Sequence, residues 1–388
     1  MQLPIPLLDS LQSVKGFDKE AFEKVHESGE QITSIRINPC KLSVESRESP
    51  GEEVIHDSRF TIHEKVPWSQ YGYYLKKRPS FTFDPLFHAG CYYVQEASSM
   101  FLEQALKQAI DLTQPLKVLD LCAAPGGKST HILSLISDKS LLVCNDVIRS
   151  RANILKENII KWGCTNAVVT NNDPQDFAKL ENYFDVIVVD APCSGSGLFR
   201  RDEEAIEEWS LNNVALCSQR QQRILADVWP SLKRDGILIY STCSYSKEED
   251  EDILDWVMST LTIDMCQLSL DAGWGIVKSG GGYRFWPEKI KGEGFFMACF
   301  RKTDGDESLP LKRKSKRIGL TKVEKEIVER WVNTVGLQFI KYEDTVYAWL
   351  SYLAADFNML LIQLRIIYSG TIIGELMGDK LIPNHALA

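Results

Sequence analysis

Across the middle of the chain, short apolar runs typical of buried β-strands alternate with helix-like stretches. The apolar runs are KVLDL (117–121), LLVC (141–144), AVVT (167–170), DVIVVD (185–190) and GILIYST (236–242). The helix-like stretches are 129–137, 149–162 and 212–233. Strands that alternate with helices are typical of βαβ units, and a strand that is apolar along its length is typically buried on both faces. The pattern therefore predicts an α/β fold with a mostly parallel sheet.

The alternating pattern covers only part of the 388 residues, a length that suits two or three domains. We expect a small N-terminal domain over 1–79, which mixes helix-like and strand-like pieces, and a core domain over 80–302. Residues 303–317 pass from an acidic Gly/Ser/Pro stretch into a basic run, which indicates a linker. Beyond it, a helical pattern and strand-like runs with Gly turns predict a small α+β domain over 318–388.

Composition narrows the class of protein. Hydrophobic residues make up 44% and charged residues 25%, as in ordinary globular proteins, which argues against a disordered or fibrous chain. The N-terminus lacks a secretory pattern, and the apolar stretch 359–373 is too short and too polar to span a bilayer. None of the ten cysteines forms a Cys-x-x-Cys pair, so we expect no metal site. We expect a soluble, cytoplasmic protein.

The sequence CAAPGGK (122–128) follows the first predicted strand and precedes a helix, as in loops that bind nucleotide-like ligands. It lacks the GxGxxG spacing of dinucleotide sites. It nearly matches an NTP-binding loop, because Gly127, Lys128 and Ser129 are present, but Cys122 stands at the first glycine position. S-adenosylmethionine (SAM) is the third candidate ligand.

Acidic and amide residues follow three further predicted strands. Asp146 follows the second strand, Asn171, Asn172 and Asp173 follow the third, and Asp190 ends the fourth. An acid at such a position can bind ribose hydroxyls, and the residues after the third strand could line an adenine pocket. Several acids around one ligand would repel a triphosphate, so this set favours SAM over an NTP.

Two cysteines also follow predicted strands on the same rim: Cys193 in DAPCSGSG and Cys243 in STCSY. After Cys243, Ser246 and Glu249 match a capping box, and the neighbouring acids indicate the first turn of a helix and not a metal site. Beside a methyl donor, a thiolate that adds to carbon 6 of a cytosine makes carbon 5 nucleophilic, which is covalent catalysis. A second thiol could assist release, and Asp190 could hydrogen-bond the N3/N4 edge of the ring.

These motifs resemble those of the Sun/Nop-type RNA (cytosine-5) methyltransferases. The similar segments, in order, are FHAGCYYVQEASSM, LCAAPGGKST, NDVIRSRANILKENIIKWG, VVDAPCSGSGLFRRD, YSTCSYSKEEDE and RFWPEKIKGEGFFMA, with a weaker match in LRIIYSGTIIGEL and IPNHALA. The bacterial RsmF-like branch, which methylates small-subunit ribosomal RNA, is the most similar. Ser129 stands where threonine is usual in this family.

The resemblance implies a class I SAM-dependent methyltransferase core, Rossmann-like, with small N-terminal and C-terminal domains that bind RNA. The C-terminal domain would be PUA-like and, because the chain stops at HALA where relatives continue, compact or truncated. The resemblance assigns Cys243 as the nucleophile and Cys193 to release, and we expect Asp190 to be the third catalytic residue because of its possible hydrogen bond to the ring. The SAM contacts that it implies are Cys122, Ala123, Ala124, Pro125, Gly126, Gly127, Lys128, Asp146, Arg151, Asp173 and Asp190.

A net charge of −9 argues against non-specific RNA binding by the whole molecule, so RNA would have to bind at local basic groups. The candidates are Lys76, Lys77, Arg78, Arg200, Arg201, the cluster 312–317, and Arg36 with Asn38 in SIRINP. Arg200 and Arg201 are favoured because they directly follow the Cys193 loop. Tyr92, Tyr93 and Phe199 could stack on bases, although aromatic residues are more often in the core.

We therefore expect methylation of carbon 5 of a cytosine in RNA, with SAM as methyl donor and 16S rRNA, naked or in the 30S subunit, as the favoured partner. Transfer RNA is an alternative substrate. A P-loop-like NTPase and a non-catalytic RNA-binding protein are the alternatives from other classes. The sequence does not fix the oligomeric state, and a monomer is favoured.

Overall fold

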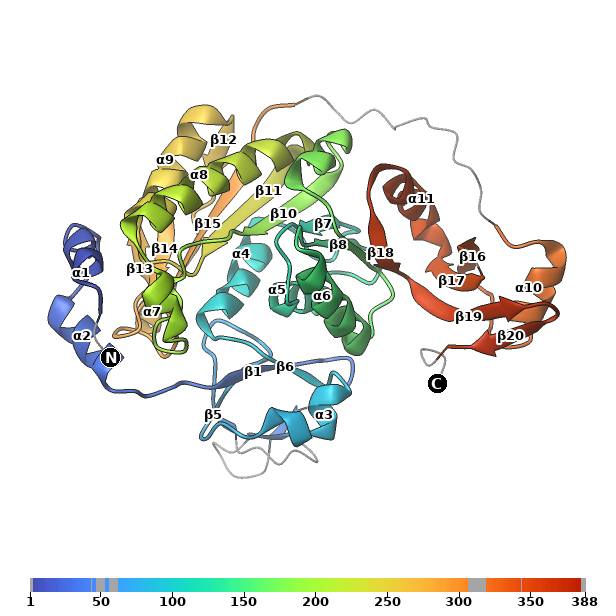
Figure 1. Cartoon of the computed structure of the whole chain (residues 1–388), viewed down its shortest axis with the longest axis horizontal. Helices are drawn as coiled ribbons and strands as arrows, with labels where there is room; N and C mark the ends of the chain where they lie inside the picture. Colours follow the sequence, from blue (N-terminus) through green and yellow to red (C-terminus); the bar gives the residue numbers. More distant parts are fainter. Residues whose placement is uncertain are drawn as a thin grey trace.

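A mixed ten-stranded sheet forms the centre of the molecule, with helices on both faces (Figure 1). The computed structural model describes residues 3–42, 44–46, 53–55, 62–305, 319–342 and 344–384. The strand order is β13-β14-β15-β11-β10-β7-β8-β9-β18, and β12 pairs with β15. The strands are β7 (Lys117–Asp120), β8 (Leu141–Asn145), β9 (Ala167–Thr170), β10 (Phe184–Asp190), β11 (Leu232–Thr242), β12 (Ile263–Met265), β13 (Val277–Ser279), β14 (Gly282–Phe285), β15 (Phe295–Lys302) and β18 (Ile366–Ser369).

The five strands predicted from the sequence are β7 to β11, and they pair with one another in parallel. The strands on either side of them run antiparallel, including β15 against β11 and β18 against β9. The α/β fold is therefore confirmed, and its sheet is parallel at the centre and antiparallel at both edges. No helix in the described part of the chain is long and apolar enough to cross a membrane.

Alternating strand residues build a separate apolar core on each face of the sheet. On one face, Val118 and Val188 pack with α4 (Leu102–Ala109), α5 (Gly127–Leu133) and α6 (Arg149–Trp162). The other face packs against α8 (Leu211–Val228), α9 (Glu251–Thr260) and α11 (Ala354–Gln363). The expected helix over 212–233 ends earlier, since Pro230 cannot continue it and β11 begins at Leu232.

The N-terminal part forms a second, antiparallel sheet of order β4-β5-β1-β6. Because β6 belongs to this sheet, the sheet continues past residue 79, the expected domain boundary. The helices α1 and α2 precede this sheet in the chain and pack beside α7, as Figure 1 shows. The elements of this part and the small hairpin β2-β3 are α1 (Ile5–Leu11), α2 (Lys19–Glu27), β1 (Ser34–Ile37), β2 (Val44–Ser46), β3 (Glu53–Ile55), β4 (Ile62–Lys65), β5 (Gly72–Leu75), α3 (Pro85–His88) and β6 (Tyr92–Val94); α7 is Glu204–Glu208.

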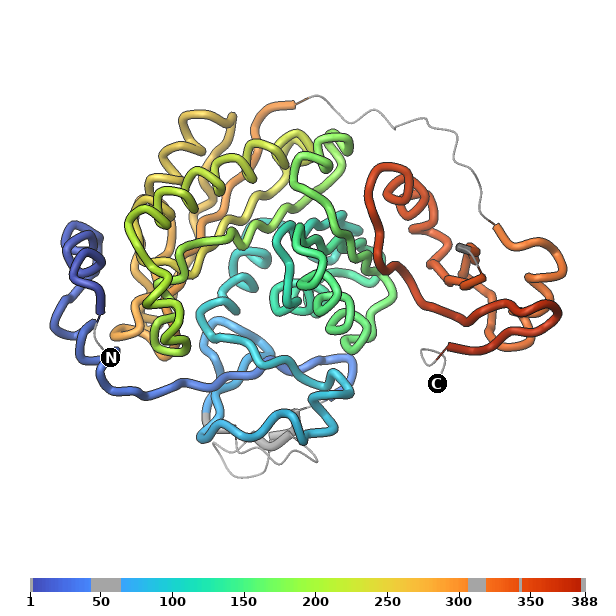
Figure 2. The backbone as a smooth tube through the Cα atoms, in the orientation of Figure 1, coloured from blue at the N-terminus to red at the C-terminus, as the bar shows by residue number. Residues whose placement is uncertain are grey.

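The C-terminal part lies at the opposite end of the molecule from α1 and α2 (Figure 2). It forms a third sheet, β16-β17-β19-β20, and sends β18 back to the edge of the central sheet. Its elements are α10 (Lys322–Val328), β16 (Leu337–Tyr342), β17 (Thr345–Leu350), α11, β18, β19 (Thr371–Met377) and β20 (Lys380–Pro383). Most of the expected linker, 303–317, and the final residues HALA lie outside the described residues.

Candidate active site

Three loops meet at the carboxyl ends of neighbouring parallel strands. The Gly-rich loop (122–128) follows β7, the first cysteine loop (190–197) follows β10, and the second cysteine loop (241–245) follows β11. Asp190 of β10 is paired with Ser241 of β11, so the two cysteine loops start side by side. The parallel register therefore brings all three loops to one rim of the sheet, where ligands bind in open α/β folds.

A cavity of about 400 Å³ lies between these loops. Cys243 and Asp190 line it together with most of the Gly-rich loop, including Lys128. Sequence reasoning missed the rest of its lining, which comes from other segments: Val94, Gln95, Glu96, Ser99, Leu198, Glu293, Gly294 and Phe295. Two of the predicted catalytic residues, Cys243 and Asp190, and most of the Gly-rich loop thus share one cavity.

The two cysteines expected to act together are in contact. The Sγ atoms of Cys193 and Cys243 are 3.0 Å apart, and both residues are half-buried. The hydrogen bond with Cys243, and then burial, raise the pKa of Cys193 well above its ordinary value. The raised pKa keeps Cys193 protonated at neutral pH, and either sulfur can act as the donor in the contact between the two residues. Cys243 is the one that lines the cavity, where its sulfur can act as a nucleophile.

Glycine at position 197 allows the two cysteine loops to close on each other. The amide of Gly197 donates to the carbonyl oxygen of Cys243 at 2.9 Å. A Cβ at this position would lie 2.4 Å from the carbonyl oxygen of Gly294 and 2.8 Å from that of Cys243. A larger residue would therefore push the loops apart.

Glu249 does not form the capping box that the sequence predicted. Its side chain is fully buried, while Ser246 Oγ has no hydrogen-bond partner among the described residues. The carboxylate of Glu249 accepts hydrogen bonds from the amide of Ser194 at 2.8 Å, from Ser194 Oγ at 2.5 Å and from Ser244 Oγ at 2.7 Å. One carboxylate thus joins the residues that follow the two cysteines.

The acidic run after Glu249 forms the first turn of α9, as predicted, and its first residues are buried. Asp250 and Glu251 are buried, and both pair with the buried side chain of Arg284. Asp250 also accepts a hydrogen bond from Thr242 Oγ1 at 2.6 Å. A buried charge is retained only when it is paired, so this cluster fixes the second cysteine loop to α9 and β14.

Lys128 and Asp190 form an ion pair in the cavity, with 2.8 Å between Nζ and Oδ2. Ser241 Oγ donates to the other carboxylate oxygen of Asp190 at 2.7 Å. The side chain of Asp190 is about one-third exposed, whereas that of Lys128 is mostly buried. Asp190 is therefore held in a fixed orientation, with its carboxylate accessible from the cavity.

Arg36 and Asn38, suggested as RNA contacts, have structural roles instead, because both are fully buried. Arg36 donates to Gln95 Oε1 at 2.8 Å, to Thr130 Oγ1 at 2.6 Å and to the carbonyl oxygen of Gly127 at 3.3 Å. The guanidinium therefore supports the start of α5 and the end of the Gly-rich loop from the N-terminal sheet.

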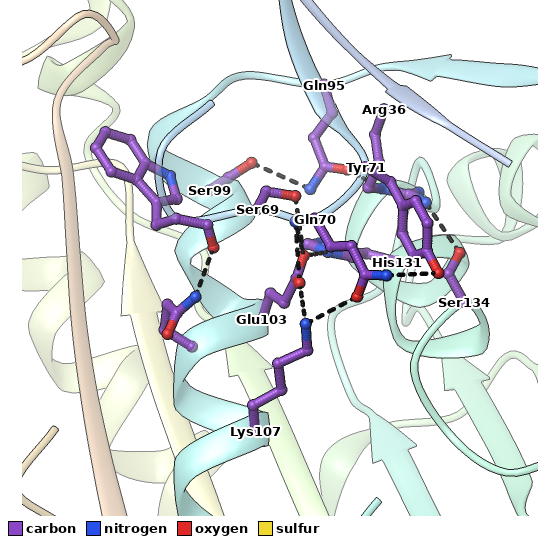
Figure 3. Close-up of polar contacts among 12 residues, drawn as sticks. Arg36, Ser69, Gln70, Tyr71, Gln95, Ser99, Glu103, Lys107, His131 and Ser134 are labelled. Atoms are coloured by element: carbon purple, nitrogen blue, oxygen red, sulfur yellow. Dashed lines mark hydrogen bonds and ion pairs between the residues drawn. The ribbon is translucent and has the colours of Figure 1, made fainter. Parts of the chain in front are cut away.

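A second polar network supports α5 from α4 (Figure 3). The fully buried carboxylate of Glu103 accepts from Ser69 Oγ at 2.9 Å, from His131 Nε2 at 3.1 Å and from Lys107 Nζ at 2.5 Å. Burial lowers the pKa of His131 to about 4, so its ring is neutral. Although burial opposes it, the contacts with His131 and Lys107 lower the pKa of Glu103 to about 2.

The predicted cofactor residues Asp146, Arg151 and Asp173 do not line the cavity. Asp146 is buried after β8 and lies 3.6 Å from Arg151, which donates to the carbonyl oxygen of Ala124 in the Gly-rich loop at 2.9 Å. Asp173 caps the short helix η3 (Pro174–Lys179). Their assignment to the cofactor stays a prediction.

The two arginines favoured as RNA contacts differ in burial. Arg200 is 8% exposed and donates to the carbonyl oxygens of Glu30 and Gly292 at 2.6 and 3.1 Å, so its prediction as an RNA contact is wrong. Arg201 is exposed and lines the cavity. Lys76, Lys77 and Arg78 are exposed, and the cluster 312–317 lies outside the described residues.

The three aromatic candidates for base stacking also differ in how exposed their side chains are. Tyr92 and Phe199 are buried in the core and cannot stack on a base. Tyr93 is half-buried and lines the cavity.

Two family models match the chain. Residues 107–301 match the model described as 16S rRNA methyltransferase RsmB/F, and residues 3–97 match the N-terminal domain of 16S rRNA methyltransferase RsmF. The ribosomal RNA small subunit methyltransferase F of Psychromonas ingrahamii is 34% identical over 278 residues, which are 70% of this chain and 57% of that protein. The one of Shewanella piezotolerans is 31% identical over 349 residues, 86% of this chain and 72% of that protein. The chain thus spans little more than half the length of several curated relatives that it matches.

Solved structures show the same fold. A methyltransferase homologue from Pyrococcus horikoshii has a TM-score of 0.57 and 25% identity, covering 77% of this chain and 100% of that one. NSun6 from the same organism, solved with the SAM analogue SFG, has a TM-score of 0.60 and 20% identity, covering 78% and 99%.

Proposed function

This chain belongs to the 16S rRNA methyltransferase RsmB/F family, and from that premise we propose that it transfers a methyl group from SAM to carbon 5 of a cytosine in 16S rRNA. The observation that carries the proposal is the contact between Cys193 and Cys243, of which Cys243 lines a cavity shared with the Gly-rich loop. Two thiols in contact, one of them lining the cavity, suit covalent catalysis on a pyrimidine better than they suit binding alone.

Methyltransferases of this family use SAM, and the Gly-rich loop fits it. A Cβ at Gly127 would lie 3.4 Å from the ring of Tyr93, so glycine keeps this part of the cavity open to a ligand. Lys128 pairs with Asp190 and is not free to bind phosphates, which weighs against an NTP in the same loop. Asp146 is the residue that would bind the ribose hydroxyls. When bound, SAM supplies an electrophilic methyl group.

In the proposed reaction, the Cys243 thiolate adds to carbon 6 of the cytosine, so that a carbon–sulfur bond forms and carbon 5 becomes nucleophilic. Asp190, fixed by Lys128 and Ser241, hydrogen-bonds the N3/N4 edge and orients the ring for attack by the thiolate. After carbon 5 takes the methyl group, a base such as a water molecule accepts the proton from carbon 5. The bond between carbon 6 and sulfur then breaks and restores the thiolate. Cys193, in contact with the departing sulfur, assists this release.

The target cytosine must leave its stack to reach the cavity. Arg201, which is exposed at the cavity, and the basic group Lys76–Arg78 are the described residues that we assign to the RNA backbone. The C-terminal domain, expected to be PUA-like, would provide a further RNA contact.

Two alanine substitutions test the assignment of the cysteines. Cys243→Ala should abolish methyl transfer, whereas Cys193→Ala should form the bond to carbon 6 but release it slowly, so that a protein–RNA adduct persists on a denaturing gel. Cys40→Ala is the matched control, since Cys40 is an exposed thiol that does not line the cavity. Turnover by Cys243→Ala would contradict its role as nucleophile, and the absence of any adduct with Cys193→Ala would contradict its role in release.

A further inference from the structure

The C-terminal part of the chain reaches the residues that follow β9. Strand β18 pairs antiparallel with β9, with Ile366 opposite Thr170 and Ser369 opposite Val168. This register places Arg365, the residue before β18, against Asn171 and Asn172, the residues after β9. The peptide groups of Arg365 therefore border the rim on which the cofactor loop lies.

A first chain of hydrogen bonds leads from Arg365 to the Gly-rich loop. The amide of Arg365 donates to Asn172 Oδ1 at 2.9 Å, and Asn172 Nδ2 donates to the carbonyl oxygen of Arg365 at 3.2 Å. The backbone of Asn172 is joined in turn to the side chain of Asn145 by two bonds of 2.9 and 3.0 Å. Asn145 Nδ2 donates to the carbonyl oxygen of Leu121 at 3.1 Å, and the amide of Ala123 donates to the carbonyl oxygen of Asn145 at 2.7 Å.

A second chain leads from Arg365 to the acid after β8. The amide of Asn171 donates to the carbonyl oxygen of Arg365 at 3.0 Å. Asn171 Nδ2 donates to the carbonyl oxygens of Asp146 and Val147 at 2.8 and 3.0 Å. Arg365 thus contacts both asparagines, and through them it is linked to Asp146 and to the start of the Gly-rich loop.

Burial makes these hydrogen bonds energetically costly to break. Asn145 and Asn172 are both buried, and a buried polar group that loses its partner costs the full free energy of its desolvation. The bonds therefore specify one conformation of the loop after β9. Since Arg365 supplies them from the C-terminal part, that conformation depends on β18 remaining in the central sheet.

We propose that Asn171 and Asn172 are positioning residues for the cofactor, and that the C-terminal domain, through the peptide groups of Arg365, sets the shape of the SAM site. The inference rests on the proposed function in one respect, namely that SAM is the ligand of this rim. It makes the C-terminal domain part of the cofactor site, in addition to any contact that the domain makes with RNA.

The test is the affinity of the full-length protein for SAM, measured by isothermal titration calorimetry without RNA. Asn172→Ala removes both side-chain bonds to Arg365 and keeps the backbone bonds to Asn145, and we expect the Kd for SAM to rise about tenfold. In turnover assays, KM for SAM should rise while kcat and the KM for RNA stay near the wild-type values. Asn171→Ala, which breaks only the second chain, gives an independent result if Asn172→Ala does not fold, and its Kd for SAM should rise several-fold.

The matched control loosens the same domain at the other end of the strands. Asp356 in α11 accepts hydrogen bonds from Tyr183 at 2.7 Å and pairs with Lys117, at the start of β7, at 2.6 Å. Asp356→Asn should leave the Kd for SAM within about twofold of wild type, while its melting temperature falls.

The outcomes separate this inference from the proposed function. Folded Asn172→Ala and Asn171→Ala proteins that bind SAM as tightly as wild type would overturn the inference and leave the proposed function intact. An equal loss of affinity in Asp356→Asn would also overturn it, because general loosening of the domain would then explain the effect. A wild-type protein that binds no SAM would overturn the proposed function, and the inference with it.

Discussion

At the scale of single residues, the geometry of the cysteine pair depends on a carboxylate that does not line the cavity. Glu249 accepts hydrogen bonds from Ser194 and Ser244, each of which directly follows one of the two cysteines. Sequence reasoning assigned Glu249 to a capping box at the start of a helix, because the local spacing matches one. One of these partners, Ser194, comes from a loop 55 residues away in the sequence, and local spacing carries no information about that contact.

Glu249→Gln should therefore impair catalysis more than cofactor binding. The amide cannot accept all the bonds that the carboxylate accepts, so the two sulfurs lose their alignment, and small misplacements of reacting groups cost on the order of 100-fold in rate. We expect kcat to fall 10- to 100-fold with the Kd for SAM unchanged. Glu248→Gln, at the exposed neighbouring position, is the control. A normal kcat for Glu249→Gln would show that the carboxylate does not position the cysteines.

Arg200 and Arg201 should give opposite results when each is replaced by alanine. Removal of Arg200 leaves the buried carboxylate of Glu293 without its 3.4 Å partner, so the protein should lose about 3 kcal/mol of stability in a denaturant titration. Arg201→Ala should leave stability unchanged and raise the KM for RNA several-fold, more so at low salt. Equal effects of the two substitutions on stability would contradict the separation of their roles.

At the scale of elements, α5 is fixed by contacts that the sequence did not reveal. Its expected range, 129–137, was close to the observed Gly127–Leu133, since a glycine-rich loop marks the start of a helix well. The contacts of Arg36 and Glu103 with this helix join residues far apart in the sequence, so neither periodicity nor motif spacing could identify them. The strands were predicted more accurately, because a continuous apolar run is by itself enough to indicate a buried strand.

The burial of His131 predicts how stability depends on pH. The pKa of His131 is lowered from 6.5 to about 4 by burial, so below pH 6.5 the unfolded chain binds a proton that the folded chain does not. Stability should therefore be lost as the pH falls from 6.5 towards 4, by about 2 kcal/mol at pH 5 from this group. His131→Gln should lose less stability between pH 7 and pH 5 than wild type does, as measured by urea unfolding. An unchanged pH dependence would show that His131 is not buried in its neutral form.

At the scale of the whole molecule, the parts that flank the core contribute to the site. The N-terminal sheet supplies Arg36, and the segment around β6 supplies Tyr93 and Gln95 to the cavity. The C-terminal part adds β18 to the central sheet beside the loop after β9. The sequence pattern predicted three regions and a site at the carboxyl ends of the parallel strands. It did not predict that the C-terminal region joins the central sheet, because the pairing of β18 with β9 is a long-range contact.

The central claim is the transfer of a methyl group to carbon 5 of a cytosine in small-subunit rRNA. The most direct measurement incubates the full-length protein with methyl-labelled SAM and, separately, with 30S subunits, naked 16S rRNA and transfer RNA, and then identifies the labelled nucleoside after digestion. We predict label in 5-methylcytidine from the rRNA or the 30S subunit and none from transfer RNA. Label in another nucleoside, or only in transfer RNA, or no label from a protein that binds SAM, would contradict the claim.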